Sequence, residues 1–201
     1  MKKKIVVSLL CIALTVGVLS GCVEEKKGPV ASFTYSPTTV YVNTTAVTFT
    51  DTSTDEDGTI ASWEWDLGDG TTATTQNVTH TYSTVATVTV TLTVTDNDGT
   101  NDTTTQSITV SYTPPTAAFT YDPMVNITVN TTITFTDNST KGDANITSWL
   151  WDFGDDNTSN ATNPTHQYAA IGDYTVTLTV TDANDETDTS DEVVIEVTET
   201  T

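Results

Sequence analysis

The sequence predicts an all-β protein made of two tandem β-sandwiches. Three observations carry this prediction. The chain repeats itself at a constant offset of 86 residues, apolar residues alternate with Thr along most segments of both copies, and no segment has useful helical periodicity. About seven short strands in each copy of about 85 residues are typical of a two-sheet sandwich.

The repeat is defined by aromatic, His and Asp residues that recur at the same spacing. The matched pairs include Phe33 and Phe119, Tyr35 and Tyr121, Trp63 and Trp149, Trp65 and Trp151, His80 and His166, Tyr82 and Tyr168, and Asp96 and Asp182. The constant offset predicts no insertion before the last strand, where the alternation indicates a shift of one residue. The predicted domains are residues 29–113 and 114–198, with the boundary at Thr113-Pro114-Pro115.

Each copy reads as a series of strands separated by turn residues. In the first copy the alternating segments are 30–35, 47–50, 60–66, 85–95 and a last strand that ends near Val110. The stretch Asp96-Asn97-Asp98-Gly99 predicts the hairpin turn before that last strand. Thr suits the outward positions because its β-branched side chain favours pleated, half-exposed surfaces.

The N-terminus predicts export and a lipid anchor. Residues 1–4 are basic and residues 5–18 are apolar, a run too short to span a bilayer, so residues 1–21 are predicted to be a signal peptide. The run ends in Leu19-Ser20-Gly21-Cys22, which resembles the lipobox of prokaryotic lipoproteins. That resemblance implies cleavage before Cys22 and lipidation of Cys22, with residues 22–28 as a tether. The alternative is an ordinary secretory signal with a Cys near its cleavage site by chance.

The charge balance excludes one class of partner. The chain has 27 acidic residues and 6 Lys or Arg, for a formal net charge of −21. From Gly28 onward the only Lys or Arg is Lys141, so the domains would repel phosphate backbones, and nucleic acid is not an expected partner. The two Cys residues, Cys11 and Cys22, both precede the domains, which therefore contain no disulfide and no Cys metal site.

The most specific local sequence is Trp63-Glu64-Trp65-Asp66-Leu67-Gly68-Asp69-Gly70, repeated as 149–156. Large apolar residues alternate and the chain then turns sharply, with Gly68 able to supply a positive φ. Trp65 and Trp151 are the predicted structural core residues of their sandwiches.

These stretches resemble the PKD domain family, an immunoglobulin-like β-sandwich whose hallmark is W-D-F-G-D-G. Residues 151–155 match five letters of the hallmark, and residues 65–70 match it with Leu67 in place of Phe. The second copy departs from the pattern at residues 141–144 and at Asp156. The resemblance implies extracellular modules that contact protein or carbohydrate or act as spacers, and that are not enzymes.

No catalytic residue is predicted. His80 and His166 are the only His residues, and no nucleophile signature accompanies them. A Ser/His/Asp arrangement is open on sequence grounds alone, but a structural His that hydrogen-bonds a neighbour is the favoured interpretation.

Two binding sites are predicted as alternatives to purely structural roles. No cofactor is certain, and Asp55 and Asp57 on an acidic turn are candidate Ca²⁺ ligands, because Ca²⁺ takes several oxygen ligands and some PKD domains of secreted collagenases bind it through acidic loops. The alternative is a solvated turn. Trp63 and Trp149 are candidate ligand-contact aromatics that could stack on sugars, against a structural role under a loop.

The sequence therefore predicts a non-catalytic lipoprotein of the cell envelope, held by lipid at Cys22 and facing outward. Its expected partners are the membrane, through the anchor, and an extracellular protein or polysaccharide. The alternative is an accessory lipoprotein that binds substrate for a separate extracellular hydrolase.

Overall fold

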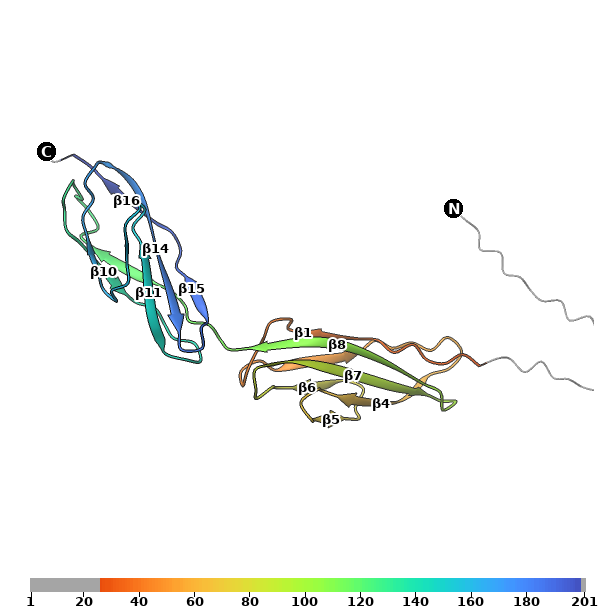
Figure 1. The fold of residues 1–201 in the computed structure, drawn as a ribbon. Coiled ribbons are helices and arrows are strands. Elements are labelled where there is room, and N and C mark those ends of the chain that lie inside the picture. Colours follow the sequence, from red (N-terminus) through yellow and green to blue (C-terminus); the bar gives the residue numbers. More distant parts are fainter. Residues whose placement is uncertain (1–25, 200–201) are drawn as a thin grey trace, which may run out of the picture.

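The computed structural model describes residues 26–199, and every regular element in that range is a β-strand (Figure 1). The predicted signal peptide and Cys22 lie outside the described residues. Within 26–199 there is no helix with the length and apolarity that a bilayer crossing requires. The predicted all-β fold class is confirmed.

The first sandwich has a three-stranded sheet and a five-stranded sheet. The small sheet has the order β1–β3–β6, with β1 at Phe33–Ser36, β3 at Val47–Asp51 and β6 at Val78–His80. The large sheet has the order β2–β8–β7–β4–β5, with β2 at Val40–Tyr41, β8 at Asn101–Ser111, β7 at Ala86–Asp96, β4 at Ile60–Asp66 and β5 at Thr72–Ala73. All of these pairings are antiparallel except that of β2 with β8.

The second sandwich repeats this plan with one strand divided. Its small sheet has the order β13–β10–β9, with β13 at Thr165–His166, β10 at Ile133–Asp137 and β9 at Phe119–Asp122. Its large sheet contains β12 at Thr158–Ser159, β11 at Ile146–Asp152, β14 at Gly172–Asp182, β15 at Thr187–Thr189 and β16 at Val193–Val197. Both β15 and β16 pair with β14.

The longest strand of each copy shows why the alternation produces a sandwich. Along β7 the side chains of Val88, Val90, Leu92 and Val94 are buried, and the intervening Thr residues face outward. Side chains on a strand point alternately to its two faces, so this pattern buries one face of the sheet and leaves the other polar. Each copy forms its own hydrophobic core.

The sequence interpretation of the repeat needs one correction. Asn43 N donates to Tyr82 O at 2.8 Å, and Asn130 N donates to Tyr168 O at 2.9 Å. The two Asn residues are therefore structural equivalents although their offset is 87 rather than 86. The second copy therefore has one extra residue before Asn130 and one residue fewer after it. The two changes cancel by Ile133, where the offset is 86 again, so the pattern of apolar residues does not reveal them.

The shift predicted in the last strand is confirmed. In the first copy β8 is continuous, and Ala86 lies opposite Val110. In the second copy Thr179 lies opposite Thr189, but Gly172 lies opposite Val197, so one extra residue separates the two registers. The additional residue divides the strand into β15 and β16. Some strands, such as β2 and β5, were not predicted from the sequence. Each has only two residues, which is too few for an alternating pattern to be recognised.

Candidate functional sites

The Trp residues predicted for the core lie at its centre. Trp65 and Trp151 are fully buried, and each makes an edge-to-face contact with the Phe of the first strand at a centroid distance of 5.2 Å. The indole N–H of Trp65 donates to Thr75 O at 2.9 Å, and that of Trp151 donates to Ala161 O at the same distance. A buried indole needs such a partner, so the side chain fixes the following loop as well as the core.

The candidate ligand-contact aromatics are half-buried. Trp63 and Trp149 pack against the edges of the two cores. Trp63 Nε1 donates to Asp51 Oδ2 at 2.8 Å, and Trp149 Nε1 donates to Asp137 Oδ2 at 2.7 Å. Hydrogen bonds to a charged acceptor orient a ring strongly, so part of each indole has a structural role.

Each His belongs to a repeated His–Asp–Tyr arrangement at the turn after the Trp motif. His80 Nε2 lies 2.7 Å from Asp69 Oδ2, and His166 Nε2 lies 2.9 Å from Asp155 Oδ2. The ring of His80 meets Tyr82 edge-on at 4.7 Å. A carboxylate only accepts hydrogen bonds, so the imidazole places a proton on Nε2.

The electrostatics of this arrangement are those of a structural pair. Burial alone would raise the pKa of Asp69, but hydrogen bonds from His80 and Thr71 outweigh it and hold that pKa below its usual value. Burial, with the charge of Asp69, raises the pKa of Tyr82 to about 12, so the phenol keeps its proton. That proton is used in a bond to the Leu67 carbonyl at 3.0 Å. The His and Tyr of each copy therefore hold the turn in place.

The acidic turn of the first copy, residues 55–58, forms a clamp: its carboxylates bind the segment that leads into the domain. Asp57 Oδ2 accepts a hydrogen bond from Lys27 N at 3.0 Å. Lys27 Nζ lies 2.7 Å from Glu56 Oε2, and Lys26 Nζ pairs with the Asp98 carboxylate. The hydrogen bonds to these carboxylates raise the pKa of both ammonium groups above the usual value, against a smaller opposing effect of desolvation.

The second copy keeps the clamp without the Lys residues. Asp143 Oδ2, the counterpart of Asp57, accepts from Thr113 N at 2.6 Å, and Asp143 N donates to Thr113 O at 3.1 Å. A side chain on Gly142 would collide with the backbone of Thr113 and Pro114, so the linker lies directly against this turn. The turn holds the start of each domain.

A Ca²⁺ site at the acidic turn needs several converging oxygen ligands. Asp55 Oδ1 accepts from Asp57 N at 3.3 Å, and the nearby buried Asp96 has one carboxylate oxygen without a hydrogen-bond partner. Across residues 26–199, no group of three or more His, Cys, Asp or Glu side chains is placed to hold a metal ion. Asp57 and Asp55 both accept backbone hydrogen bonds within the fold, and their role as Ca²⁺ ligands stays a prediction.

A second pair of clamps was not predicted from the sequence. Ala31 N donates to Asp102 Oδ2, and Ala117 N donates to Asp188 Oδ2, both at 2.8 Å. These carboxylates connect the first segment of each domain to its last strand. The 86-residue spacing of the two Asp residues was the available signal, but the many other acidic residues obscured it.

Comparison with known proteins gives two consecutive matches to one family model. The model is that of the PKD domain, and it matches residues 26–111 and 112–197. Each match covers one of the two sandwiches.

Similar sequences occur within larger proteins. A microbial collagenase of Vibrio alginolyticus is 52% identical over 50 residues, which are 25% of this chain and 6% of the collagenase. The pre-pro-metalloprotease PrtV of Vibrio cholerae is 48% identical over 52 residues, which are 26% of this chain and 6% of that protein. The chain thus corresponds to a small part of the length of these relatives.

Solved structures of single domains are also similar. The PKD1 domain of Vibrio cholerae PrtV is 38% identical, with 43% of this chain and 99% of that domain covered and a TM-score of 0.38. The PKD1 domain of Vibrio anguillarum Epp is 33% identical, with 43% and 98% covered and a TM-score of 0.39. Since the family model matches both halves of the described structure in succession, the chain belongs to the PKD domain family.

Proposed function

We propose that the protein is a non-catalytic cell-surface lipoprotein whose two PKD domains contact an extracellular protein or polysaccharide or act as a spacer. The proposal rests on one observation: the His, Asp and Tyr side chains that could take part in catalysis are engaged in hydrogen bonds that stabilise the fold. Each His is bonded to an Asp, and the buried Tyr beside it donates to a backbone carbonyl. A module built in this way offers surfaces rather than a reaction centre.

The anchor is tested by Cys22→Ser, with Cys11→Ser as the matched control. If Cys22 carries the lipid, its substitution blocks processing or releases the protein from the membrane fraction. Cys11 lies inside the apolar run of the predicted signal peptide, so its substitution leaves membrane retention unchanged. Retention of the Cys22→Ser variant at the level of the control would refute the anchor without touching the proposal of a contact module.

The alternative is an accessory lipoprotein that binds polysaccharide or protein for a separate extracellular hydrolase. A shallow hollow on the second sandwich favours it, because Trp149 and several residues with hydroxyl groups border it. The hollow is lined by Thr147, Ser148, Trp149, Leu150, Asn160, Ala161, Thr162, Thr179 and Thr181. Stacking on an aromatic ring with hydrogen bonds beside it is a combination suited to a sugar. The names of the relatives, a collagenase and a metalloprotease, support a hydrolase as the protein served.

A glycan array and a pull-down with collagen test this alternative. Trp149→Ala should abolish binding. Leu150→Glu is the comparison variant, because it introduces the residue of the first copy, Glu64, into the hollow and keeps the indole. Trp63→Ala reports whether the first copy contributes. Binding that survives both Trp substitutions would remove the aromatic site from the proposal.

A further inference from the structure

Exposed apolar side chains gather at the end of the second sandwich where β16 finishes. Met124 is 66% exposed, Val125 is 71% exposed, Ile171 is 56% exposed and Val194 is 58% exposed. Met124 and Val125 lie in the loop between β9 and β10, Val194 lies on the outward face of β16, and Ile171 immediately precedes β14. Scattered exposed apolar residues are ordinary, but a group of them on one surface indicates an interaction site.

Two hollows join these residues into one surface. The first is lined by Tyr121, Met124, Val125, Asn126, Ile127, Val194, Glu196 and Thr198. The second is lined by Ile171, Gly172, Asp173, Glu196, Val197, Thr198 and Glu199. Because Glu196 and Thr198 border both, the apolar residues lie on either side of an acidic strip.

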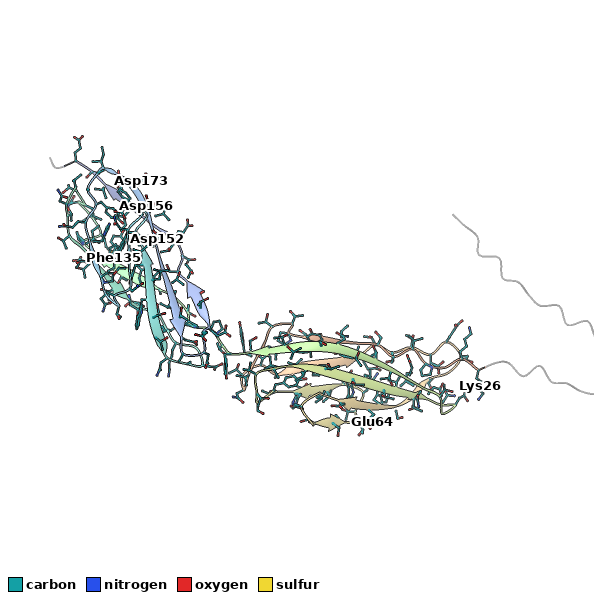
Figure 2. The ribbon with its side chains drawn as sticks, in the orientation of Figure 1. Lys26, Glu64, Phe135, Asp152, Asp156 and Asp173 are labelled. Atoms are coloured by element: carbon teal, nitrogen blue, oxygen red, sulfur yellow. The ribbon has the colours of Figure 1, made fainter. Side chains whose placement is uncertain are left out.

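The centre of this strip is a pair of like charges. Asp173 of β14 lies directly opposite Glu196 of β16 in the antiparallel register, and both side chains are exposed. Figure 2 labels Asp173 on the second sandwich, toward the C-terminal end of the described chain. Like charges directly opposite on neighbouring strands destabilise a sheet, so this pair works against the fold that carries it.

The first sandwich shows that the fold does not require these residues. At the position of the acidic pair it has Thr87 opposite Thr109, with the two hydroxyls 3.4 Å apart. Ser107 stands where the second copy has Val194, because Thr89 pairs with Ser107 as Thr175 pairs with Val194. The residues after Pro37 are Thr38 and Thr39, where Met124 and Val125 follow Pro123.

We propose that this surface, the acidic-apolar end (Met124, Val125, Ile171, Asp173, Val194 and Glu196), binds a cationic polypeptide segment. A Lys or Arg side chain of the partner lies between Asp173 and Glu196 and relieves their repulsion. Apolar side chains beside it cover Met124, Val125, Val194 and Ile171. The inference rests on the proposed function as a contact module and names the surface and the chemistry of the partner.

Charge decides among the occupants. A second copy of this chain would bring a net charge of −21 against an acidic rim, and like-charge juxtaposition disfavours such an interface. A neutral glycan would donate hydroxyl hydrogen bonds to the two carboxylates but would leave their mutual repulsion uncompensated. A bare metal ion does not explain the apolar residues on both sides, whereas a basic segment with apolar neighbours satisfies both features.

The test uses the full chain and a labelled Lys/Leu peptide of about a dozen residues, with fluorescence anisotropy as the readout. Asp173→Thr/Glu196→Thr and Met124→Thr/Val194→Ser install the first copy's residues, which the same fold accommodates. We expect each double variant to weaken peptide binding by about tenfold or more. The Asp173→Thr/Glu196→Thr variant should also melt at a higher temperature, because the repulsion is removed.

Matched controls separate this site from general attraction to an acidic protein. Glu56→Thr/Glu64→Thr removes the same charge from the first copy and should leave the affinity within about threefold of the original. An equal loss in this control, or equal binding of a Lys/Ser peptide, would overturn the proposal. So would a concentration-dependent dimer, seen by sedimentation and abolished by the same substitutions, because it would assign the surface to a second copy. Failure of the peptide to bind would refute the proposed binding at this surface. It would leave the proposals of the lipid anchor and of the hollow beside Trp149 unaffected, because those have tests of their own.

Discussion

The Tyr82 hydroxyl donates a 3.0 Å hydrogen bond to the Leu67 carbonyl, and Tyr168 makes the equivalent 2.8 Å bond to the Phe153 carbonyl. Each Tyr is fully buried and follows the last strand of the small sheet, while each carbonyl follows the Trp strand of the large sheet. The bond therefore joins the two sheets of a sandwich at one end. Its occurrence in both copies makes it the first interaction to test.

Tyr168→Phe should destabilise the second sandwich by about 1–3 kcal/mol, because the Phe153 carbonyl is left buried without its partner. Chemical denaturation of the full chain, followed by Trp fluorescence, measures the loss. Tyr174→Phe is the matched control, since the Tyr174 hydroxyl makes an exposed bond to Ala170 O that water can replace. Equal effects of the two substitutions would contradict the structural role of the Tyr168 bond.

Trp65→Ala should destabilise the first sandwich by about 3–5 kcal/mol, because it opens a cavity in the core and removes the bond to Thr75 O. Trp63→Ala, two residues earlier on the same strand, should cost clearly less because Trp63 is half-buried. Thermal unfolding of both variants provides the comparison. A larger effect at Trp63 would contradict the central position of Trp65 in the core.

Gly68→Ala should be far more damaging than Gly70→Ala. Both residues have positive φ, 79° and 91°, which costs an Ala roughly 1–2 kcal/mol. A Cβ on Gly68 would also lie 2.6 Å from the Thr89 carbonyl oxygen, whereas a Cβ on Gly70 meets nothing within 4 Å. The difference between the two melting temperatures isolates the steric clash, and equal losses would mean that backbone conformation alone accounts for Gly68.

Asp69→Asn should destabilise the first sandwich by about 1–2 kcal/mol at neutral pH, because the bond to His80 loses its charged acceptor. The folded state lowers the pKa of Asp69 below 3.8, so its contribution is complete above that value and is lost as the pH falls through the folded pKa. The difference in stability between the original protein and Asp69→Asn should therefore shrink in acid. Glu64→Gln is the control for charge removal, and a pH-independent difference for Asp69→Asn would contradict the assignment.

The candidate sites show where sequence reading stops. Alternation places Trp63 and Trp65 on the same, inner face of β4, because side chains two residues apart on a strand point the same way. It did not show that Trp63 would bond Asp51 or that Asp57 would accept from Lys27, since these contacts join segments that meet only after the sheets pair. The sequence also suggested sites from composition, and the structure shows that many of those carboxylates and rings are bonded within the fold.

The sequence by itself determined the two copies, their strand pattern and the core Trp residues, because periodicity and repetition are properties of the chain alone. Only the tertiary structure decided the compensating shift at Asn130 and the opposition of Asp173 to Glu196. Register depends on which residues of distant strands meet, and a shift of one residue changes every partner along a strand. The acidic-apolar end follows from that register and from the loop folded beside it.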